Sequence, residues 1–381
     1  MRQKDCVSTD RVKIYVMIHK PFEVPGDPMY IPVQVGRKEA KSLLGYTGDD
    51  SGDNISDQNC YFSELTGLYW VWKNVTDTEY VGTCHYRRYL LNEKGYMFTG
   101  AEIVELLSKY DVITTKNLQL NFSYYEGFSF HHKIRYLDET GQVIRERCPV
   151  YYETFQKLVH EKHTYFGNML ICRKELYDAY CAWLFDILFE VQRRVPVEEE
   201  DSYHRRIFGF ISEFLQYVWI CHNHLRVKEC MVGMLGEKAE VTEVKRQLAD
   251  FFAAGDCDGA KAFFLEARRK RPDLLMEASD ITGELHLCME VIAIAGLEQE
   301  AYGHSILDKI RDYRELMLYC NKLNRYALQK SGCGITGGKS EVLLGSACKD
   351  NRQIEPELER WKEAAGVTPV ALNVACNMLK I

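Results

Sequence analysis

Short apolar segments alternate with helix-compatible segments through the first third of the chain, and this alternation limits the fold more than any other feature. Residues 12–18 and 80–84 have the composition of buried strands, and residues 110–114 resemble them. Between these segments, residues 61–74 and 101–109 place apolar side chains at helical spacing. Strands that alternate with helices are typical of a parallel sheet covered by helices, so we expect an α/β sandwich with a mostly parallel sheet.

The character of the sequence changes near residue 240. Before that point we expect a loop over 117–147, a strand over 165–172 and helices over 173–195 and 205–219. Beyond it only helical patterns are evident. They cover 241–253, 258–271, 283–295, 301–328, 356–365 and 368–379, with a Gly- and Ser-rich loop over 331–350. A chain of 381 residues favours two domains, here an α/β domain over 1–240 and a helical domain over 241–381.

The composition excludes several classes of function. The net charge of −7 argues against general nucleic-acid binding, which normally needs a basic surface. The 14 cysteines include no Cys-x-x-Cys pair, so reduced thiols fit better than a disulfide scaffold. No signal peptide and no run of about 18 apolar residues is evident. We therefore expect a cytoplasmic protein, and peripheral association with the inner face of a membrane stays open.

The sequence His85-Tyr86-Arg87-Arg88 follows one predicted strand directly and is the strongest candidate site. Ligands bind at strand ends in open α/β sheets, and the guanidinium fork of Arg suits phosphate or diphosphate. Adjacent side chains of a strand point to opposite faces, so Arg87 and Arg88 would face one ligand together only if the strand ended before them. The alternative is a pair of surface charges.

The loop from Asp49 to Asp57 is rich in carboxylates and amides. An EF-hand-like metal loop does not fit, because no Glu stands at the twelfth position. Two interpretations remain: Asp53 and Asn54 bind a ribose or a base, or the loop caps the next helix through Asx turns. His19 and Lys20, after the first strand, could contact a base or a phosphate.

Arg206 and Glu213 are seven residues apart in a predicted helix, which places them on one face. Apolar residues flank Glu213, and a carboxylate in such a setting tends to a raised pKa and can act as a base. A buried structural Glu–Arg pair is the equal alternative.

Several motifs in order carry a family resemblance over roughly residues 12–235. They are Lys13-Ile14-Tyr15-Val16, Gly52-Asp53-Asn54-Ile55-Ser56, Glu64-Leu65-Thr66-Gly67-Leu68-Tyr69-Trp70-Val71-Trp72-Lys73-Asn74, Gly82-x-x-His85-Tyr86-Arg87-Arg88-Tyr89, Asn168-Met169 and Arg206-x-x-Gly209-Phe210-x-x-Glu213. Together they resemble a bacterial polysaccharide-biosynthesis family, once catalogued as a domain of unknown function and now regarded as glycosyltransferases. Its members belong to capsule, exopolysaccharide and O-antigen clusters, and some resemble galactosyl- or galactofuranosyltransferases.

The resemblance implies a GT-A-like fold that takes a UDP-sugar donor and a glycan or lipid-linked acceptor. Many such enzymes carry an Asp-x-Asp metal motif where this chain has His85-Tyr86-Arg87. We therefore expect no cofactor and no metal ligand, with Arg and His neutralising the diphosphate. A Mn²⁺ or Mg²⁺ ion held by Asp49, Asp50 or Asp53 is the less favoured alternative.

The resemblance also assigns roles to individual residues. The expected catalytic residues are Glu213 as base, Arg206, and Asp201 as the rival base. The expected donor-binding residues are Ile18, His19, Lys20, Asp53, Asn54, Ile55, Ser56, His85, Tyr86, Arg87 and Arg88, and the expected acceptor-binding residues are Asn168 and Tyr165. The helical part would bind a partner, self-associate or position the acceptor. A non-catalytic scaffold that binds a nucleotide sugar or a glycan is the rival interpretation.

Overall fold

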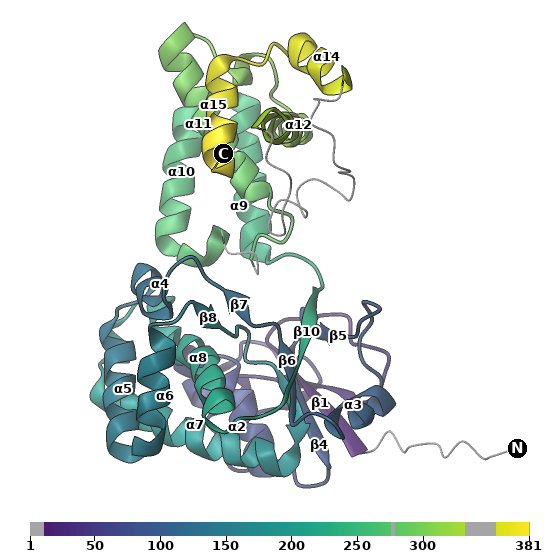
Figure 1. The fold of residues 1–381 in the computed structure, drawn as a ribbon, viewed down its shortest axis with the longest axis vertical. Coiled ribbons are helices and arrows are strands. Elements are labelled where there is room, and N and C mark those ends of the chain that lie inside the picture. Colours follow the sequence, from purple (N-terminus) through teal and green to yellow (C-terminus); the bar gives the residue numbers. More distant parts are fainter. Residues whose placement is uncertain (1–10, 276–278, 332–355, 381) are drawn as a thin grey trace, which may run out of the picture. The chain divides into compact units, whose positions relative to one another are not determined.

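The computed structural model describes residues 11–275, 279–331 and 356–380 (Figure 1). Contacts within the chain divide it into two compact units, residues 1–235 and residues 236–381. The first unit contains the strands, and the second is helical in its described part. Each unit has its own hydrophobic core.

One eight-stranded sheet forms the centre of the first unit. Its strands are β1 (Val12–Ile18), β2 (Tyr30–Gln34), β3 (Thr47–Gly48), β4 (Tyr80–His85), β5 (Arg88–Leu91), β6 (Val112–Thr115), β9 (Leu170–Arg173) and β10 (Val227–Met234). The order is β3-β2-β1-β4-β5-β10-β6-β9, and β9 also pairs with β4. A second small sheet pairs β7 (Leu118–Gln119) with β8 (His163–Thr164).

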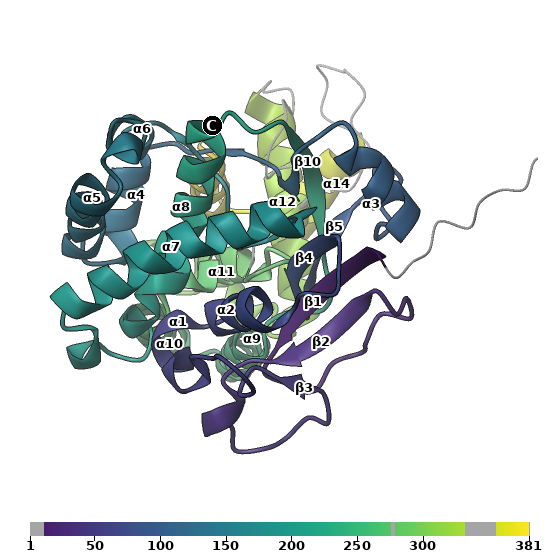
Figure 2. The same ribbon diagram turned by 90° about the horizontal axis from the view of Figure 1, so that it is seen from below.

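The large sheet is mixed, so the expectation of a mostly parallel sheet is not confirmed. The pairs β1–β2, β1–β4, β2–β3 and β6–β10 are parallel. The pairs β4–β5, β5–β10, β4–β9 and β6–β9 are antiparallel. The antiparallel part begins where β4 reverses into β5 after two residues, since so short a connection can only join antiparallel strands. Figure 2 shows the parallel strands β1, β2 and β3 side by side.

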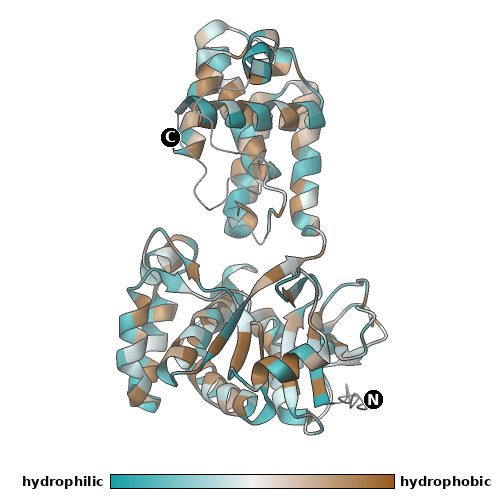
Figure 3. Ribbon diagram, turned by 45° about the vertical axis from the view of Figure 1, so that its right-hand side comes forward, coloured by the Kyte–Doolittle hydropathy of each residue, from teal (hydrophilic) through white to brown (hydrophobic). Residues whose placement is uncertain are grey.

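Helices cover this sheet. They are α1 (Asn59–Phe62), α2 (Leu65–Asn74), α3 (Gly100–Leu107), α4 (Tyr124–His131), α5 (Arg135–Arg147), α6 (Pro149–Val159), α7 (Lys174–Arg194) and α8 (Ile207–His222). Helix α2 packs closely on β1, because a Cβ added at Gly67 would lie 2.3 Å from Met17 Sδ. Figure 3 shows hydrophobic residues along the central strands and hydrophilic residues on the outer faces of the helices.

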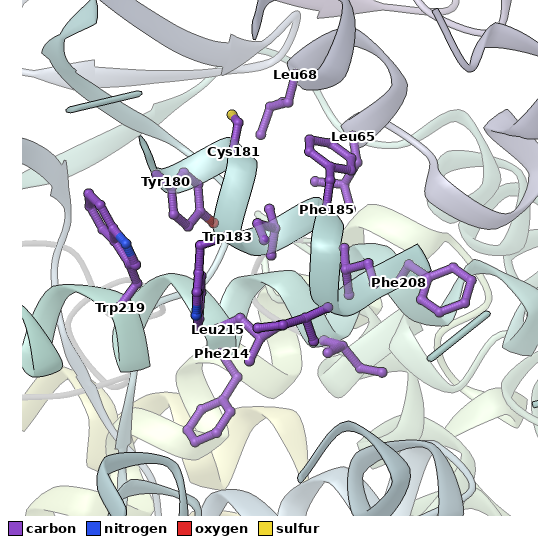
Figure 4. Packing of buried hydrophobic residues seen from close by; sticks show 14 of the residues in the cluster. Leu65, Leu68, Tyr180, Cys181, Trp183, Phe185, Phe208, Phe214, Leu215 and Trp219 are labelled. Carbon is purple, nitrogen blue, oxygen red and sulfur yellow. The ribbon is translucent and has the colours of Figure 1, made fainter. Parts of the chain in front are cut away.

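The core of this unit forms where α2, α7 and α8 meet. Leu65 and Phe208 are fully buried there, and Trp72 stacks on Phe185 with ring centroids 5.9 Å apart. Figure 4 shows side chains of these three helices packed together. The long apolar helix expected over 173–195 is confirmed as α7. This packing fixes the starts of α2 and α8, which position the site residues Glu64 and Glu213.

The expectation of a loop over 117–147 is wrong, because this segment contains α4 and α5. Ser123 and Glu126 form a capping box at the start of α4, with each side chain accepting from the other's main-chain amide. Interspersed Phe and Tyr concealed the helical period. The expected strand over 165–172 is shorter, since only its end forms β9.

The single helix expected over 61–74 is broken at Ser63. Its backbone has φ 51° and ψ −128°, which a helix does not allow, so α1 ends at Phe62 and α2 begins at Leu65. Asn59 holds the break: its side-chain amide donates to the Ser63 carbonyl at 2.6 Å.

The second unit consists of helices in its described part. They are α9 (Ala239–Ala254), α10 (Cys257–Lys270), α11 (Glu284–Tyr302), α12 (Tyr313–Ser331), α14 (Pro356–Ala365) and α15 (Pro369–Leu379). The helix expected over 301–328 is wrong at its start, because α11 continues to Tyr302 and ends at Gly303 in the left-handed conformation. The loop expected over 331–350 lies almost wholly outside the described residues.

Candidate functional site

The candidate site lies at one edge of the large sheet. Strands β1, β2, β3 and β4 run parallel, so their carboxyl ends share this edge. Strand β9 runs antiparallel to β4, which brings the residues just before β9 to the same edge. Ligands of open α/β sheets bind outside the carboxyl ends of the strands. The residues that the sequence singled out after β4 therefore meet the Gly167–Asn168 segment, and those after β1 lie at the same edge.

The hairpin between β4 and β5 decides how the cationic residues face. Strand β4 ends at His85, Tyr86 and Arg87 form the turn, and β5 begins at Arg88. His85 and Arg88 are direct partners across the hairpin, and partners in an antiparallel pair project to the same face. The strand does not continue through both Arg residues, so the constraint that would have separated them does not apply.

Gly167 is the point on which the candidate residues converge. Its main-chain amide donates to Glu213 Oε1 at 2.8 Å. Its carbonyl oxygen lies 2.6 Å from His85 Nε2. A Cβ added at Gly167 would lie 3.9 Å from Arg88 Nη1, so the guanidinium lies beside this glycine. The φ of 105° is in the region that glycine adopts readily and other residues do not.

The state of His85 follows from these neighbours. A carbonyl only accepts hydrogen bonds, so Nε2 carries a proton and donates it to Gly167. Burial lowers the pKa of His85, the charge of Glu64 raises it, and the charges of Arg88 and Arg87 lower it again, leaving it below the ordinary value. His85 is therefore a neutral imidazole at neutral pH, and the positive charge beside Gly167 belongs to Arg88.

Asn168 joins the sheet edge to α2 and α8. Its side-chain amide donates to Glu64 Oε1 at 2.7 Å and to the Gly209 carbonyl at 2.9 Å. Its side-chain oxygen accepts from Ser212 Oγ at 2.8 Å. Every polar atom of this buried side chain is engaged, which holds the backbone in the left-handed region at φ 48°. A role for Asn168 in acceptor binding would therefore pass through its neighbours.

Arg206 does not lie in the same helix as Glu213, as the spacing suggested. Helix α8 begins at Ile207, and Arg206 belongs to the short 3-10 turn before it. Its Nε donates to Ser63 Oγ at 3.0 Å, and its guanidinium lies 6.0 Å from the ring centroid of Phe210. Arg206 thus contacts the break between α1 and α2.

Asp201 has a local structural role. Its carboxylate accepts from the main-chain amides of Tyr203 and His204 and lies 2.6 Å from the His204 ring. Partial burial raises the pKa of Asp201, but the bonds to His204 and Tyr203 lower it below the ordinary value. A carboxyl group with a lowered pKa is a poorer base, so the geometry favours Glu213 over its rival.

Asp49 is fully buried, and both of its oxygens are engaged. It accepts from the main-chain amides of Gly36 (2.8 Å) and Arg37 (3.1 Å). It also accepts from Ser56 Oγ (2.5 Å) and Thr66 Oγ1 (2.6 Å). With four donors around it, Asp49 ties the loop after β3 to β2 and α2. It does not offer an oxygen to a metal ion.

The rest of the 49–57 loop rests on α2. Tyr69 donates to the carboxylate of Asp53 at 3.0 Å, and Asn74 donates to the Asp53 carbonyl at 2.8 Å. Asn54 bonds within its own turn, to the carbonyl of Gly52. Asp53 remains exposed, whereas Ile55 and Ser56 are buried. Asp50, Ser51, Asp53 and Asp57 are exposed and Asn54 is partly exposed, so the loop presents polar side chains to solvent along most of its length.

A second small cluster forms at the end of β1. The ring of exposed His19 meets the edge of Tyr86 at 5.2 Å, and the guanidinium of Arg87 lies 5.7 Å from the same ring. Lys20 follows directly and is partly exposed, while Ile18 is fully buried. Tyr86 therefore joins the residues after β1 to the β4–β5 turn.

Tyr165 is buried and faces away from these clusters. Its hydroxyl donates to Glu229 Oε1 on β10 at 2.9 Å, and burial followed by this bond raises its pKa above the ordinary value.

The structure thus brings together His85, Arg88, Asn168 and Glu213, and separately His19, Tyr86 and Arg87. It adds Glu64, which the sequence placed in a helical motif only. An acidic residue directly before α2 was the available signal.

In its described residues the protein has neither a cluster of possible metal ligands nor a membrane-spanning helix. In the part of the chain that the structure describes, no three His, Cys, Asp or Glu side chains gather as a metal site would require. None of the described helices is long and apolar enough to cross a membrane.

The fold and this edge define an α/β protein with a polar strand-end site. A family model described as "Domain of unknown function (DUF4422)" matches residues 13–224, more than half of the chain, and the chain belongs to this family. The apo structure of the bifunctional glycosyltransferase WbbM is similar at 27% identity and a TM-score of 0.54. The match covers 59% of this chain and 45% of that chain, so the chain spans less than half of WbbM. No curated protein matches the sequence.

Proposed function

We propose that the protein is a glycosyltransferase that moves a sugar from a UDP-sugar to a glycan or lipid-linked acceptor. The observation that carries the proposal is the convergence of Arg88, His85 and Glu213 on Gly167 at the carboxyl edge of the sheet. Membership of the family and the similarity to WbbM support it. Galactose or galactofuranose is the proposed sugar, and synthesis of a cell-surface polysaccharide is the proposed setting.

The first unit is proposed to bind the donor as a GT-A-like nucleotide-sugar fold. The diphosphate would lie against Arg88, with Arg87 on the same turn. Transfer passes through an oxocarbenium-like transition state in which negative charge develops on the departing diphosphate. A guanidinium held in place beforehand stabilises that charge. His85 is neutral, so its proposed task is to hold the Gly167 carbonyl and thereby the shape of the site.

Glu213 is the proposed base that takes the proton of the acceptor hydroxyl. It is partly exposed and sits in the second turn of α8, and its Oε1 already accepts from Gly167. General-base assistance of this kind contributes about 10²- to 10⁴-fold in rate. Arg206 is proposed to act through Ser63 rather than on the substrate.

The nucleoside is proposed to lie between the end of β1 and the tip of the 49–57 loop. His19, Lys20, Asp53 and Asn54 present polar groups there. The side chains of Ile18, Ile55 and Ser56 are buried, so a nucleoside would meet only their main chain.

Transfer without a metal ion is proposed from the residue types at the end of β4. His85, Tyr86 and Arg87 supply no carboxylate oxygen, which Mg²⁺ and Mn²⁺ prefer as ligands. Asp50 pairs with Arg37 at 3.5 Å, which leaves Asp53 as the loop carboxylate for the alternative, metal-bound arrangement. The helical unit is proposed to bind a partner or the acceptor, or to self-associate.

Calorimetric titration with UDP and UDP-sugars, in EDTA and then in Mn²⁺, tests the proposal. We expect binding that persists in EDTA and weakens at least tenfold in Arg88→Ala, since a bidentate charged contact contributes about 1.5–3 kcal/mol. Asp111→Asn, at the opposite edge of the sheet, is the control and should bind normally. Binding without turnover would favour the non-catalytic scaffold, and an absence of nucleotide binding would contradict the proposal.

A further inference from the structure

Glu64 has no role in the function proposed so far, yet it lies inside the cluster around Gly167. Its Oε1 accepts from Asn168, the residue that follows Gly167. The negative charge of Glu64 raises the pKa of His85, which contacts the same segment. No residue in the described part of the chain hydrogen-bonds its Oε2. Glu64 stands at the start of α2, but its carboxylate does not cap that helix.

The backbone on both sides of this contact is strained. Ser63, directly before Glu64, has φ 51° and ψ −128°, and Asn168 has φ 48°. Such conformations cost about 1–3 kcal/mol each and persist where the surroundings over-determine them. Here the side chains of Asn59 and Arg206 both bond to Ser63. The bonds from Asn59 and Arg206 therefore hold Ser63 in its strained conformation, and this conformation positions the carboxylate of the next residue, Glu64.

The first turn of α8 lies directly beside this carboxylate. A Cβ added at Gly209 would lie 3.8 Å from both oxygens of Glu64, which is ordinary contact distance. Glu64 is itself partly exposed. A ligand bound at Arg88 and Gly167 would thus find an acceptor-only group next to its diphosphate.

A carboxylate in this position suits hydroxyl donors and repels phosphate. The part of a nucleotide sugar that adjoins the diphosphate and carries hydroxyls is the sugar. We propose that Glu64 binds hydroxyl groups of the transferred sugar and so distinguishes a nucleotide sugar from the free nucleotide. This inference rests on the proposed glycosyltransferase function.

Two variants test it, and each leaves the fold intact on structural grounds. In Glu64→Gln the amide oxygen still accepts from Asn168, while an acceptor oxygen is replaced by a donor. In Gly209→Ala the added methyl group meets no protein atom closer than 3.8 Å, but it contacts both carboxylate oxygens of Glu64 and would shield them from a ligand. Alanine also favours a helix over glycine, so this variant should not lose stability.

Glu102→Gln is the matched control. Glu102 also accepts from an asparagine amide, Asn92 Nδ2 at 3.1 Å, but it caps α3 away from the site. The dissociation constants of UDP, UDP-galactose, UDP-glucose, UDP-N-acetylglucosamine and UDP-galactofuranose are measured by calorimetry for the wild type and all three variants. The ratio of the UDP constant to that of the tightest UDP-sugar is the readout.

We expect Glu64→Gln and Gly209→Ala to bind UDP at least as tightly as the wild type and to lose about tenfold in affinity for the UDP-sugar, the value of one charged hydrogen bond. Glu102→Gln should keep both affinities. Equal loss of UDP and UDP-sugar, no loss in either variant, or a fall in kcat at unchanged affinity would each overturn the inference. So would a wild type that binds every UDP-sugar no better than UDP. A wild type that binds no nucleotide would instead contradict the proposed function itself.

Discussion

Removal of the Asp49 carboxylate, which anchors the 49–57 loop, should destabilise the first unit strongly. In Asp49→Ala, the main-chain amides of Gly36 and Arg37 lose the acceptor that satisfies them inside the protein. The hydroxyl of Thr66 has another acceptor in reach, the Ser63 carbonyl at 3.1 Å. The hydroxyl of Ser56 is fully buried and loses its acceptor as well. The loss therefore falls on the two amides and on this hydroxyl.

The size of the effect follows from those three groups. A buried donor left without an acceptor costs about 1–3 kcal/mol. Three such donors give about 6 kcal/mol, a large part of the 5–15 kcal/mol by which proteins are typically stable. Asp53→Ala is the control, since this exposed carboxylate accepts from Tyr69 alone and its loss should cost less than about 1 kcal/mol.

Urea denaturation followed by tryptophan fluorescence measures the difference. Four of the five tryptophans lie in the first unit, which makes its transition separable from that of the helical unit. The chain has two units, so each transition is fitted by itself. A loss below about 1 kcal/mol in Asp49→Ala would refute the structural role. So would a stable Asp49→Ala protein that no longer binds UDP, because Asp49 would then serve the ligand.

Three further results are expected. Burial raises the pKa of Glu290 to about 7 from 4.5, although Asn324 opposes this, so the unfolded state loses its proton first and stability falls as the pH rises from about 4.5 to 7. Glu290→Gln should abolish this fall of about 3 kcal/mol, measured as unfolding of the helical unit at pH 5 and pH 8. Gly52→Ala should cost about 1–2 kcal/mol in urea denaturation of the first unit, because φ is 57° and the new Cβ would lie 1.9 Å from Asn74 Oδ1; an unchanged midpoint would contradict this. Glu213→Gln should keep its affinity for UDP and lose about 10²- to 10⁴-fold in the kcat of sugar transfer, measured as product formation, and a normal kcat would remove Glu213 as the base.

The sequence predicted those elements whose burial is regular. The strand over 12–18 is confirmed as β1, because six of its seven residues are buried and residues 14–18 form an apolar run. Strand β10 was not predicted, because it is partly exposed and contains the charged residues Lys228 and Glu229. The prediction of a loop over 117–147 failed because aromatic and polar residues mix there and hide the helical spacing. The Ser123–Glu126 capping box was a usable signal of α4.

The candidate site was predictable only in part. The position of His85 and Arg88 at a strand end followed from the apolar run before them. That both side chains project to the same face could not be predicted, because it depends on a two-residue hairpin turn for which the sequence carries no clear turn signal. The contacts of Gly167 with Glu213 and of Glu64 with Asn168 join residues 46 and 104 positions apart, so only the tertiary fold brings them together.

A crystal structure of the protein with UDP in the presence of EDTA tests the central claim most directly. We expect the diphosphate to lie within hydrogen-bonding distance of Arg88, beside Gly167, with the uridine towards His19 and the tip of the 49–57 loop. A diphosphate bound at Asp53 through a metal ion, or UDP bound on the helical unit, would contradict it.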